Sequence, residues 1–140
     1  NIWNLTGAEV HQLSLEQHDA ALAASSHLPH YLSFALVDMF AARDNSDDIF
    51  KFAAGGFRDF TRIAASDPVM WRDVALANSD AVVTLLDDYI ESLSHFREQL
   101  LQHDGEGMAQ MFARAREARR DWAEMVEGKP VPSSTDASSQ

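Results

Sequence analysis

The sequence predicts an all-α protein, a helical bundle that ends in two long helices. Apolar residues recur at helical spacing along most of the chain, and no β-type alternation lasts more than a few residues. The 6 glycines and 4 prolines gather at a few junctions and divide the chain into helix-length segments. Because 140 residues suffice for one domain with its own core, we expect a single domain over residues 1–127.

A capping box predicts where the first helix begins. Ser14 is followed by Gln17, and in this arrangement each side chain bonds the other residue's backbone amide. Pro29 has no backbone N–H, so residues 25–30 should be a break or the first turn of a new helix, with amides exposed to an anion. Tyr31 to Ala42 is almost entirely apolar, and we expect this helix to be the buried centre of the domain.

Short helices are expected in the middle of the chain. Turn and cap residues at positions 44–48 precede an apolar group at 49–53, which predicts a short helix ending at Gly55-Gly56. Pro68 suits the first turn of a later helix, which places Trp71 one turn further on.

The last third of the chain predicts two long antiparallel helices. In the first, which should continue to His103, apolar residues alternate at spacings of four and three. We call this set the apolar seam: Val82, Leu86, Tyr89, Leu93, Phe96 and Leu100. Asp104-Gly105 then breaks the chain, and an arginine-rich helix follows. Residues 128–140 are rich in Ser and Pro, and we expect a flexible tail or linker there.

Charge and composition exclude several kinds of partner. The net charge of −11 repels nucleic acid and anionic membrane surfaces, although a local cation can still bind a small anion. With no cysteine, neither a disulfide nor a thiolate zinc site can form. The longest apolar stretch, residues 28–42, is shorter than the about 20 residues of a spanning helix. We expect a cytoplasmic protein and, because the chain does not begin with methionine, a processed or cloned fragment.

Two groups of polar residues are candidates for chemistry. Asp59 and Arg62 lie on one face of the helix expected over residues 57–64, where Asp59 can orient the guanidinium toward a carboxylate. The alternative is a surface ion pair worth only ~0.2–1 kcal/mol. Ser26, His27 and His30 can hydrogen-bond a polar ligand or hold a metal; alternatively they form a capped helix start with one buried histidine.

The motifs that hold nucleotides are missing from the sequence. There is no Gly-x-Gly-x-x-Gly, no phosphate-binding loop and no Gly-x-Ser-x-Gly elbow. We therefore expect that this chain alone binds no dinucleotide.

Four segments together resemble the C-terminal half of prephenate dehydrogenases. They are His18-Asp19, the run Ser26 to His30, the run Gly56 to Ala64, and Met70-Trp71. The resemblance extends from Trp3 to about Arg120. It implies a helical domain that dimerises a prephenate or arogenate dehydrogenase and binds the carboxylate of its substrate.

The resemblance also implies the activity of the complete enzyme. Hydride would pass from the prephenate ring to NAD or NADP while the ring carboxylate leaves as carbon dioxide, giving 4-hydroxyphenylpyruvate for tyrosine biosynthesis. A Rossmann domain earlier in the same polypeptide would carry the cofactor and the catalytic histidine. This chain would then contain no catalytic residue, no cofactor site and no metal site.

By position, the resemblance assigns Arg62 to the arginine that binds a substrate carboxylate. It assigns Ser26, His27, His30, Asp59 and Trp71 to residues that line or shape the substrate pocket. It further implies a homodimer, which the apolar seam favours, and tyrosine is a possible inhibitor. The segment that follows Glu127 is a possible linker to a further enzyme domain.

Two other classes remain as alternatives. A metal-dependent phosphohydrolase of the His-Asp type would use His18, Asp19, His27 and His30 as ligands. A module that binds tyrosine or dimerises without doing chemistry would share the helical fold.

Overall fold

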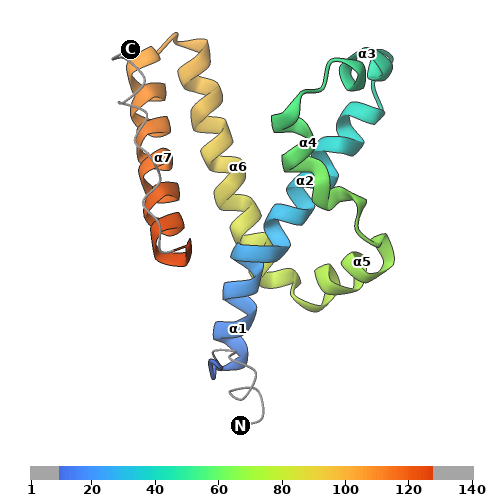
Figure 1. The fold of residues 1–140 in the computed structure, drawn as a ribbon, viewed down its shortest axis with the longest axis vertical. Helices are drawn as coiled ribbons and strands as arrows, with labels where there is room; N and C mark the ends of the chain where they lie inside the picture. Colours follow the sequence, from blue (N-terminus) through green and yellow to red (C-terminus); the bar gives the residue numbers. More distant parts are fainter. Residues whose placement is uncertain (1–9, 128–140) are drawn as a thin grey trace. The chain divides into compact units, whose positions relative to one another are not determined.

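The computed structural model describes residues 10–127 (Figure 1). The resemblance at Trp3 and the tail or linker expected over 128–140 lie outside the described residues. Within them the chain is helical and has no strand, which confirms the all-α prediction. The elements are α1 (Leu15–Leu22), η2 (Ala23–His27), α2 (Leu28–Ala41), α3 (Ser46–Lys51), α4 (Gly55–Thr61), η3 (Arg62–Ala65), α5 (Pro68–Ala77), α6 (Ser79–Leu101) and α7 (Gly105–Glu127).

The described chain forms two compact units, one up to Tyr89 and one from Ile90 onward. Helix α6 contributes its first half to the former and its second half to the latter. None of the described helices is both long enough and apolar enough to cross a membrane.

The predicted capping box begins α1. The Gln17 amide donates to the Ser14 hydroxyl at 3.2 Å, and the Ser14 amide donates to the Gln17 side-chain carbonyl at 3.0 Å. Two amides that have no partner within the helix are thereby satisfied.

Of the two alternatives predicted for residues 25–30, the break is absent, because α1, η2 and α2 follow one another without leaving helical geometry. The first turn of a new helix is present, since α2 begins at Leu28 with Pro29 in its first turn. η2 is a π-helical turn in which the Leu28 amide donates to the carbonyl of Ala23, five residues earlier. Pro29 explains this wider turn, since its ring would collide with the Ser25 carbonyl in a regular α-helix. The amides at Ala23 and Leu28 donate within the helix and are therefore not free to bind an anion.

Helix α2 is central to the first unit, where it packs against η2, α3, α4 and η3 (Figure 1). Ser33 is its one buried side chain, and the Ser33 hydroxyl donates to the Phe60 carbonyl of α4 at 3.2 Å. The expectation of burial on several sides is wrong within a single chain: Met39, for example, is 47% exposed. The helices of one chain do not cover this apolar helix completely.

The prediction that Gly55-Gly56 ends a short helix is wrong, because these two glycines are the first residues of α4. α3 ends at Lys51 and α4 begins at Gly55. The residue after α3, Phe52, keeps a negative φ of −96°, so this helix end needs no glycine in the left-handed conformation.

In the second unit, the C-terminal half of α6 and α7 form an antiparallel hairpin (Figure 1). The rings of Phe96 and Phe112 meet across it with centroids 5.9 Å apart. α6 ends at Leu101, slightly before the predicted His103, which turns the chain with a φ of 54°. A Cβ at Gly107 would collide with the side chains of Asp104 and Gln99, so a larger residue there would require these side chains to move. The prediction of two long antiparallel helices is confirmed.

The cap of α5 can be tested by mutation, because the Asp67 side chain accepts from the Met70 amide at 2.8 Å. Asp67→Ala should lower the free energy of unfolding by about 1 kcal/mol, the usual cost of losing such a cap, and urea denaturation would measure it. The control is Asp87→Ala at an exposed position within α6, which should change the stability by no more than about 0.5 kcal/mol. Equal losses in the two variants would contradict this account of the cap.

Candidate functional site

Two of the histidines singled out in the sequence, His27 and His30, contact the buried indole of a third predicted residue, Trp71. Trp71 is 9% exposed, and the His30 ring stacks on it with centroids 3.7 Å apart and planes 21° apart. The rings of His27 and Tyr31 meet Trp71 edge-on at 6.1 and 5.9 Å. We call His27, His30, Tyr31 and Trp71 the Trp71 cluster. The structure thus brings His27 and His30 into contact with Trp71.

Local structure positions both halves of this cluster. The π-helical turn ends at His27, and α2 then carries His30 and Tyr31. The Asp67 cap and Pro68 begin α5 so that Trp71 falls in its first turn. Stacking of His30 on Trp71 therefore joins α2 to α5.

Ser26 enters the site through its backbone. Its carbonyl lies 2.8 Å from Nδ1 of His30, and because a carbonyl only accepts, Nδ1 must carry a proton. This bond fixes the orientation of the His30 ring. Ser26 was predicted as a pocket residue, and in this structure its carbonyl is the group that contacts the cluster.

His27 is buried, and burial lowers the pKa of its imidazole below the ordinary value, while the charge of Asp19 opposes the shift. Its Nδ1 lies 3.2 Å from the side-chain nitrogen of Asn78, which also donates to the Asp19 carbonyl at 2.8 Å. Sequence reasoning missed Asn78, since nothing in the pattern links residues so far apart. It also missed Tyr31, although this residue directly follows His30.

Two hydrogen-bond donors in the cluster are buried with no acceptor in the described chain, the Tyr31 hydroxyl and the Trp71 indole N–H. Desolvating such a donor without a partner costs on the order of 1–3 kcal/mol. Burial also raises the pKa of the Tyr31 hydroxyl, so this group remains neutral. Buried unpaired groups are uncommon in folded proteins, and they mark this cluster as unlike an ordinary core.

Arg62 and Asp59 do not form the predicted pair. Asp59 lies 3.6 Å from Arg58, and no ion pair within residues 10–127 involves Arg62. Asp59 lies within α4, which ends at Thr61, whereas Arg62 begins the 3-10 turn η3, so the two residues do not belong to one continuous α-helix as the prediction assumed. Arg62 is exposed at the start of η3, which packs on α2. No described hydrogen bond, ion pair or ring contact joins Arg62 or Asp59 to the Trp71 cluster.

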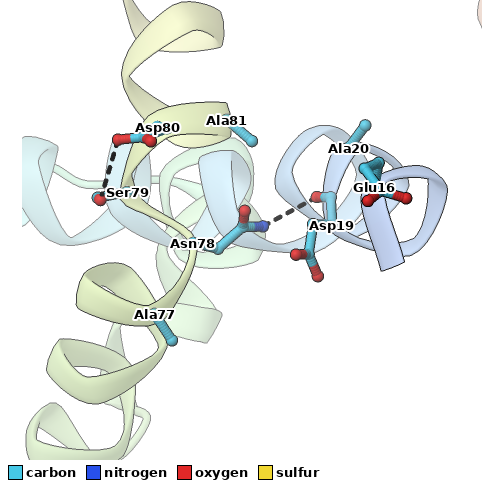
Figure 2. Close-up of a pocket in the computed structure, with 8 residues that line it drawn as sticks. All are labelled: Glu16, Asp19, Ala20, Ala77, Asn78, Ser79, Asp80 and Ala81. Atoms are coloured by element: carbon cyan, nitrogen blue, oxygen red, sulfur yellow. Dashed lines mark hydrogen bonds between the residues drawn. The ribbon is translucent and has the colours of Figure 1, made fainter. Parts of the chain in front are cut away.

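A pocket of ≈ 330 Å³ lies between α1 and the junction of α5 with α6 (Figure 2). Figure 2 shows the Asn78 side chain reaching toward the Asp19 backbone at this place. The carboxylates of Glu16, Asp19 and Asp80 line the pocket, which therefore repels an anion. We assign no substrate to it.

The described residues also bear on the metal-site alternative. His18 bonds its own neighbour, with Nδ1 3.0 Å from the Asp19 carboxylate. Within residues 10–127, no group of three or more His, Asp or Glu side chains is placed to hold a metal ion.

These features define an all-α domain that combines an imidazole- and indole-lined site with an exposed arginine. The chain belongs to the prephenate dehydrogenase family, because residues 14–114 match the model of the prephenate dehydrogenase dimerization domain.

Individual relatives agree with this assignment. The chain is 35% identical over 119 residues to a cyclohexadienyl dehydrogenase of Zymomonas mobilis, which covers 84% of the chain and 41% of that protein. It is 38% identical over 120 residues to a prephenate dehydrogenase of Bacillus subtilis, which covers 85% of the chain and 32% of that protein. The structure of prephenate dehydrogenase from A. aeolicus with hydroxyphenyl propionate and NAD+ matches with a TM-score of 0.79 and 37% identity.

The A. aeolicus match covers 86% of this chain and 42% of that chain. The chain thus spans less than half the length of the relatives it matches, and its matched part is the dimerization domain of the family model.

The pH dependence of stability tests the burial of His27. Because burial lowers its pKa below 6.5, the unfolded chain takes up a proton at a higher pH than the folded chain does. Stability should therefore fall as the pH decreases from about 7 toward the lowered pKa, and His27→Gln should remove this part of the fall. Urea denaturation at several pH values measures it.

The matched control for this experiment is His95→Gln, at an exposed position on α6. This variant should keep the fall in stability of the unaltered chain. If the stability of both variants falls equally as the pH decreases, His27 is not the group that causes the fall.

Proposed function

We propose that this chain is the substrate-binding and dimerisation half of an NAD- or NADP-dependent prephenate or arogenate dehydrogenase, a cytoplasmic enzyme of tyrosine biosynthesis. With prephenate, the complete enzyme would transfer a hydride to the nicotinamide and release the ring carboxylate as carbon dioxide. The observation that carries the proposal is the contact between His27, His30 and Trp71 in a chain that belongs to this family.

Electrostatics support Arg62 as the residue that binds a substrate carboxylate. Prephenate is a dianion, and a chain with a net charge of −11 repels it unless a cation is placed at the binding site. Arg62 is exposed and has no ion pair among the described residues, so its planar guanidinium is available for a two-pronged bond to a carboxylate.

The other assigned residues have distinct roles in this proposal. Trp71 supplies an apolar wall, and His27 and His30 supply hydrogen bonds to polar groups of the substrate. Ser26 orients His30 through its carbonyl. Asp59 adds a negative charge near the start of η3 and shapes the charge distribution around Arg62.

The cofactor belongs to the other part of the proposed enzyme. The A. aeolicus relative was solved with NAD+, and this chain matches 42% of that protein. The sequence here lacks the glycine-rich dinucleotide motif. The nicotinamide cofactor would supply the hydride acceptor, while residues of this chain bind and orient the substrate.

Exposed apolar side chains support dimerisation through a second copy of the chain. Apolar α2 is only partly covered, and several large side chains of α6 and α7 lie open to solvent. Those on α6 and α7 are Val83, Ile90, Leu93, Leu100, Leu101, Phe112, Trp122, Met125 and Val126, each 48–75% exposed. Large exposed apolar surfaces usually mark an interface, and the matching family model describes a dimerization domain.

The sharpest test of the substrate role is Arg62→Ala in the complete enzyme. Loss of a charge-assisted, two-pronged bond should cost about 2–4 kcal/mol, roughly 30- to 1,000-fold in kcat/KM for prephenate. The KM for the nicotinamide cofactor should barely change. Arg62→Lys should recover only part of the loss, because an ammonium keeps the charge without the fork of donors.

Arg58→Ala is the internal control for that measurement, since Arg58 is exposed and one turn away from Arg62. It should cost much less than Arg62→Ala. If Arg58→Ala lowered kcat/KM as much as Arg62→Ala or more, the assignment of the substrate carboxylate to Arg62 would be wrong.

Sedimentation equilibrium tests the dimer. We expect a dimer at micromolar concentration, with an interface larger than about 2,000 Å² in total. Leu93→Glu should shift the equilibrium toward monomer, because a charge buried in the interface without a partner is costly. The matched control is Thr84→Glu, at an exposed polar position of the same helix. A monomer mass that does not change with concentration would show that the apolar seam packs only within one chain.

A further inference from the structure

Asn78 connects the pieces of the chain that form the Trp71 cluster. It lies between α5 and α6, and its side-chain nitrogen contacts the Asp19 carbonyl at 2.8 Å and Nδ1 of His27 at 3.2 Å. The bond to Asp19 is drawn in Figure 2. One amide group thus ties the junction of α5 and α6 to α1 and η2.

The chemistry of these two contacts fixes the direction of both hydrogen bonds. A backbone carbonyl only accepts, so the NH2 group of Asn78, and not its oxygen, must face Asp19. The second hydrogen of the same NH2 group is then directed to Nδ1 of His27. Nδ1 must accept it, and in a neutral imidazole the proton is then on Nε2.

The surroundings of His27 favour its neutral form. Its neighbours are His18 and Asp19 on α1, His30 and Tyr31 on α2, Trp71 on α5, and Asn78. Burial and the two histidines lower the pKa of His27, and only the charge of Asp19 raises it. Protonation at Nδ1 would also place two donors against each other, unless Asn78 gave up its bond to Asp19.

The other nitrogen of the ring is available for a ligand. Among the described residues, no hydrogen-bond partner contacts Nε2 of His27. We propose that Asn78 is a positioning residue that fixes His27 as the neutral tautomer with its proton on Nε2, so that His27 donates a hydrogen bond to the substrate. This inference rests on the proposed function, which places His27 in the substrate pocket. Charge recognition is then left to Arg62, and His27 contributes a directed, uncharged donor.

The tautomer can be measured without any substitution. A long-range ¹H–¹⁵N NMR spectrum of the labelled chain near neutral pH distinguishes a protonated ring nitrogen from a bare one. We expect His27 to show a protonated Nε2 and a bare Nδ1. A proton on Nδ1, or a cationic ring, would overturn the inference.

The functional half is tested by Asn78→Asp in the complete enzyme. The new carboxylate can only accept a hydrogen bond, so it favours the tautomer with the proton on Nδ1, and a neutral His27 would present the lone pair of Nε2 to the anionic substrate. The kcat/KM for prephenate, relative to the unaltered enzyme, should fall roughly tenfold or more at about pH 8. It should recover toward about pH 6, where a protonated ring again carries a proton on Nε2.

The matched control is Asn45→Asp, which makes the same change of charge at an exposed residue whose side chain has no capping bond. Its relative kcat/KM should stay near that of the unaltered enzyme at every pH. A ratio for Asn78→Asp that is independent of pH would indicate a merely structural role and overturn the proposal. An unaltered enzyme inactive on both prephenate and arogenate would overturn the proposed function, while the NMR spectrum would still decide the tautomer.

Discussion

Burial of the Trp71 indole is the constraint on which the candidate site depends. The ring is held by stacking on His30 and by edge contacts with His27 and Tyr31, and these contacts join α5 to η2 and α2. Such ring contacts contribute about 0.5–1.5 kcal/mol each beyond the burial of their surface. The indole N–H opposes this stabilisation, because it is buried without an acceptor in the described chain. The cluster therefore combines good packing with incomplete hydrogen bonding, as functional sites often do.

The wide π-helical turn and the Trp71 cluster have a common origin in Pro29. Proline cannot continue a regular helix without a collision, and the wider turn lets α1 run into α2 while His27 remains buried beside Asn78. π-helical turns are frequent at functional sites, because they redirect side chains without ending a helix. The π-helical turn η2 thus accommodates Pro29 in the backbone and also positions His27.

Local chemistry made part of the structure predictable. The capping box at Ser14 and the helix start at Pro68 depend on residues within one helical turn, and both are as expected. The Asp59–Arg62 pair was predicted wrongly because α4 ends at Thr61, before Arg62, and Asp59 pairs with the adjacent Arg58; the residue pattern reveals neither. Asn78 could not be found from the sequence, since its contact with His27 spans 51 residues. Burial of α2 was overestimated because an apolar sequence shows that a helix needs cover but not which chain provides it.

The central claim is that the Trp71 cluster and Arg62 form one wall of a substrate site. A crystal structure of the complete dehydrogenase with hydroxyphenyl propionate, the ligand present in the A. aeolicus relative, tests it most directly. The account predicts the ligand's carboxylate within hydrogen-bond distance of the Arg62 guanidinium, and contact between the ligand and His27, His30 or Trp71. A ligand bound with none of these residues in contact would contradict it.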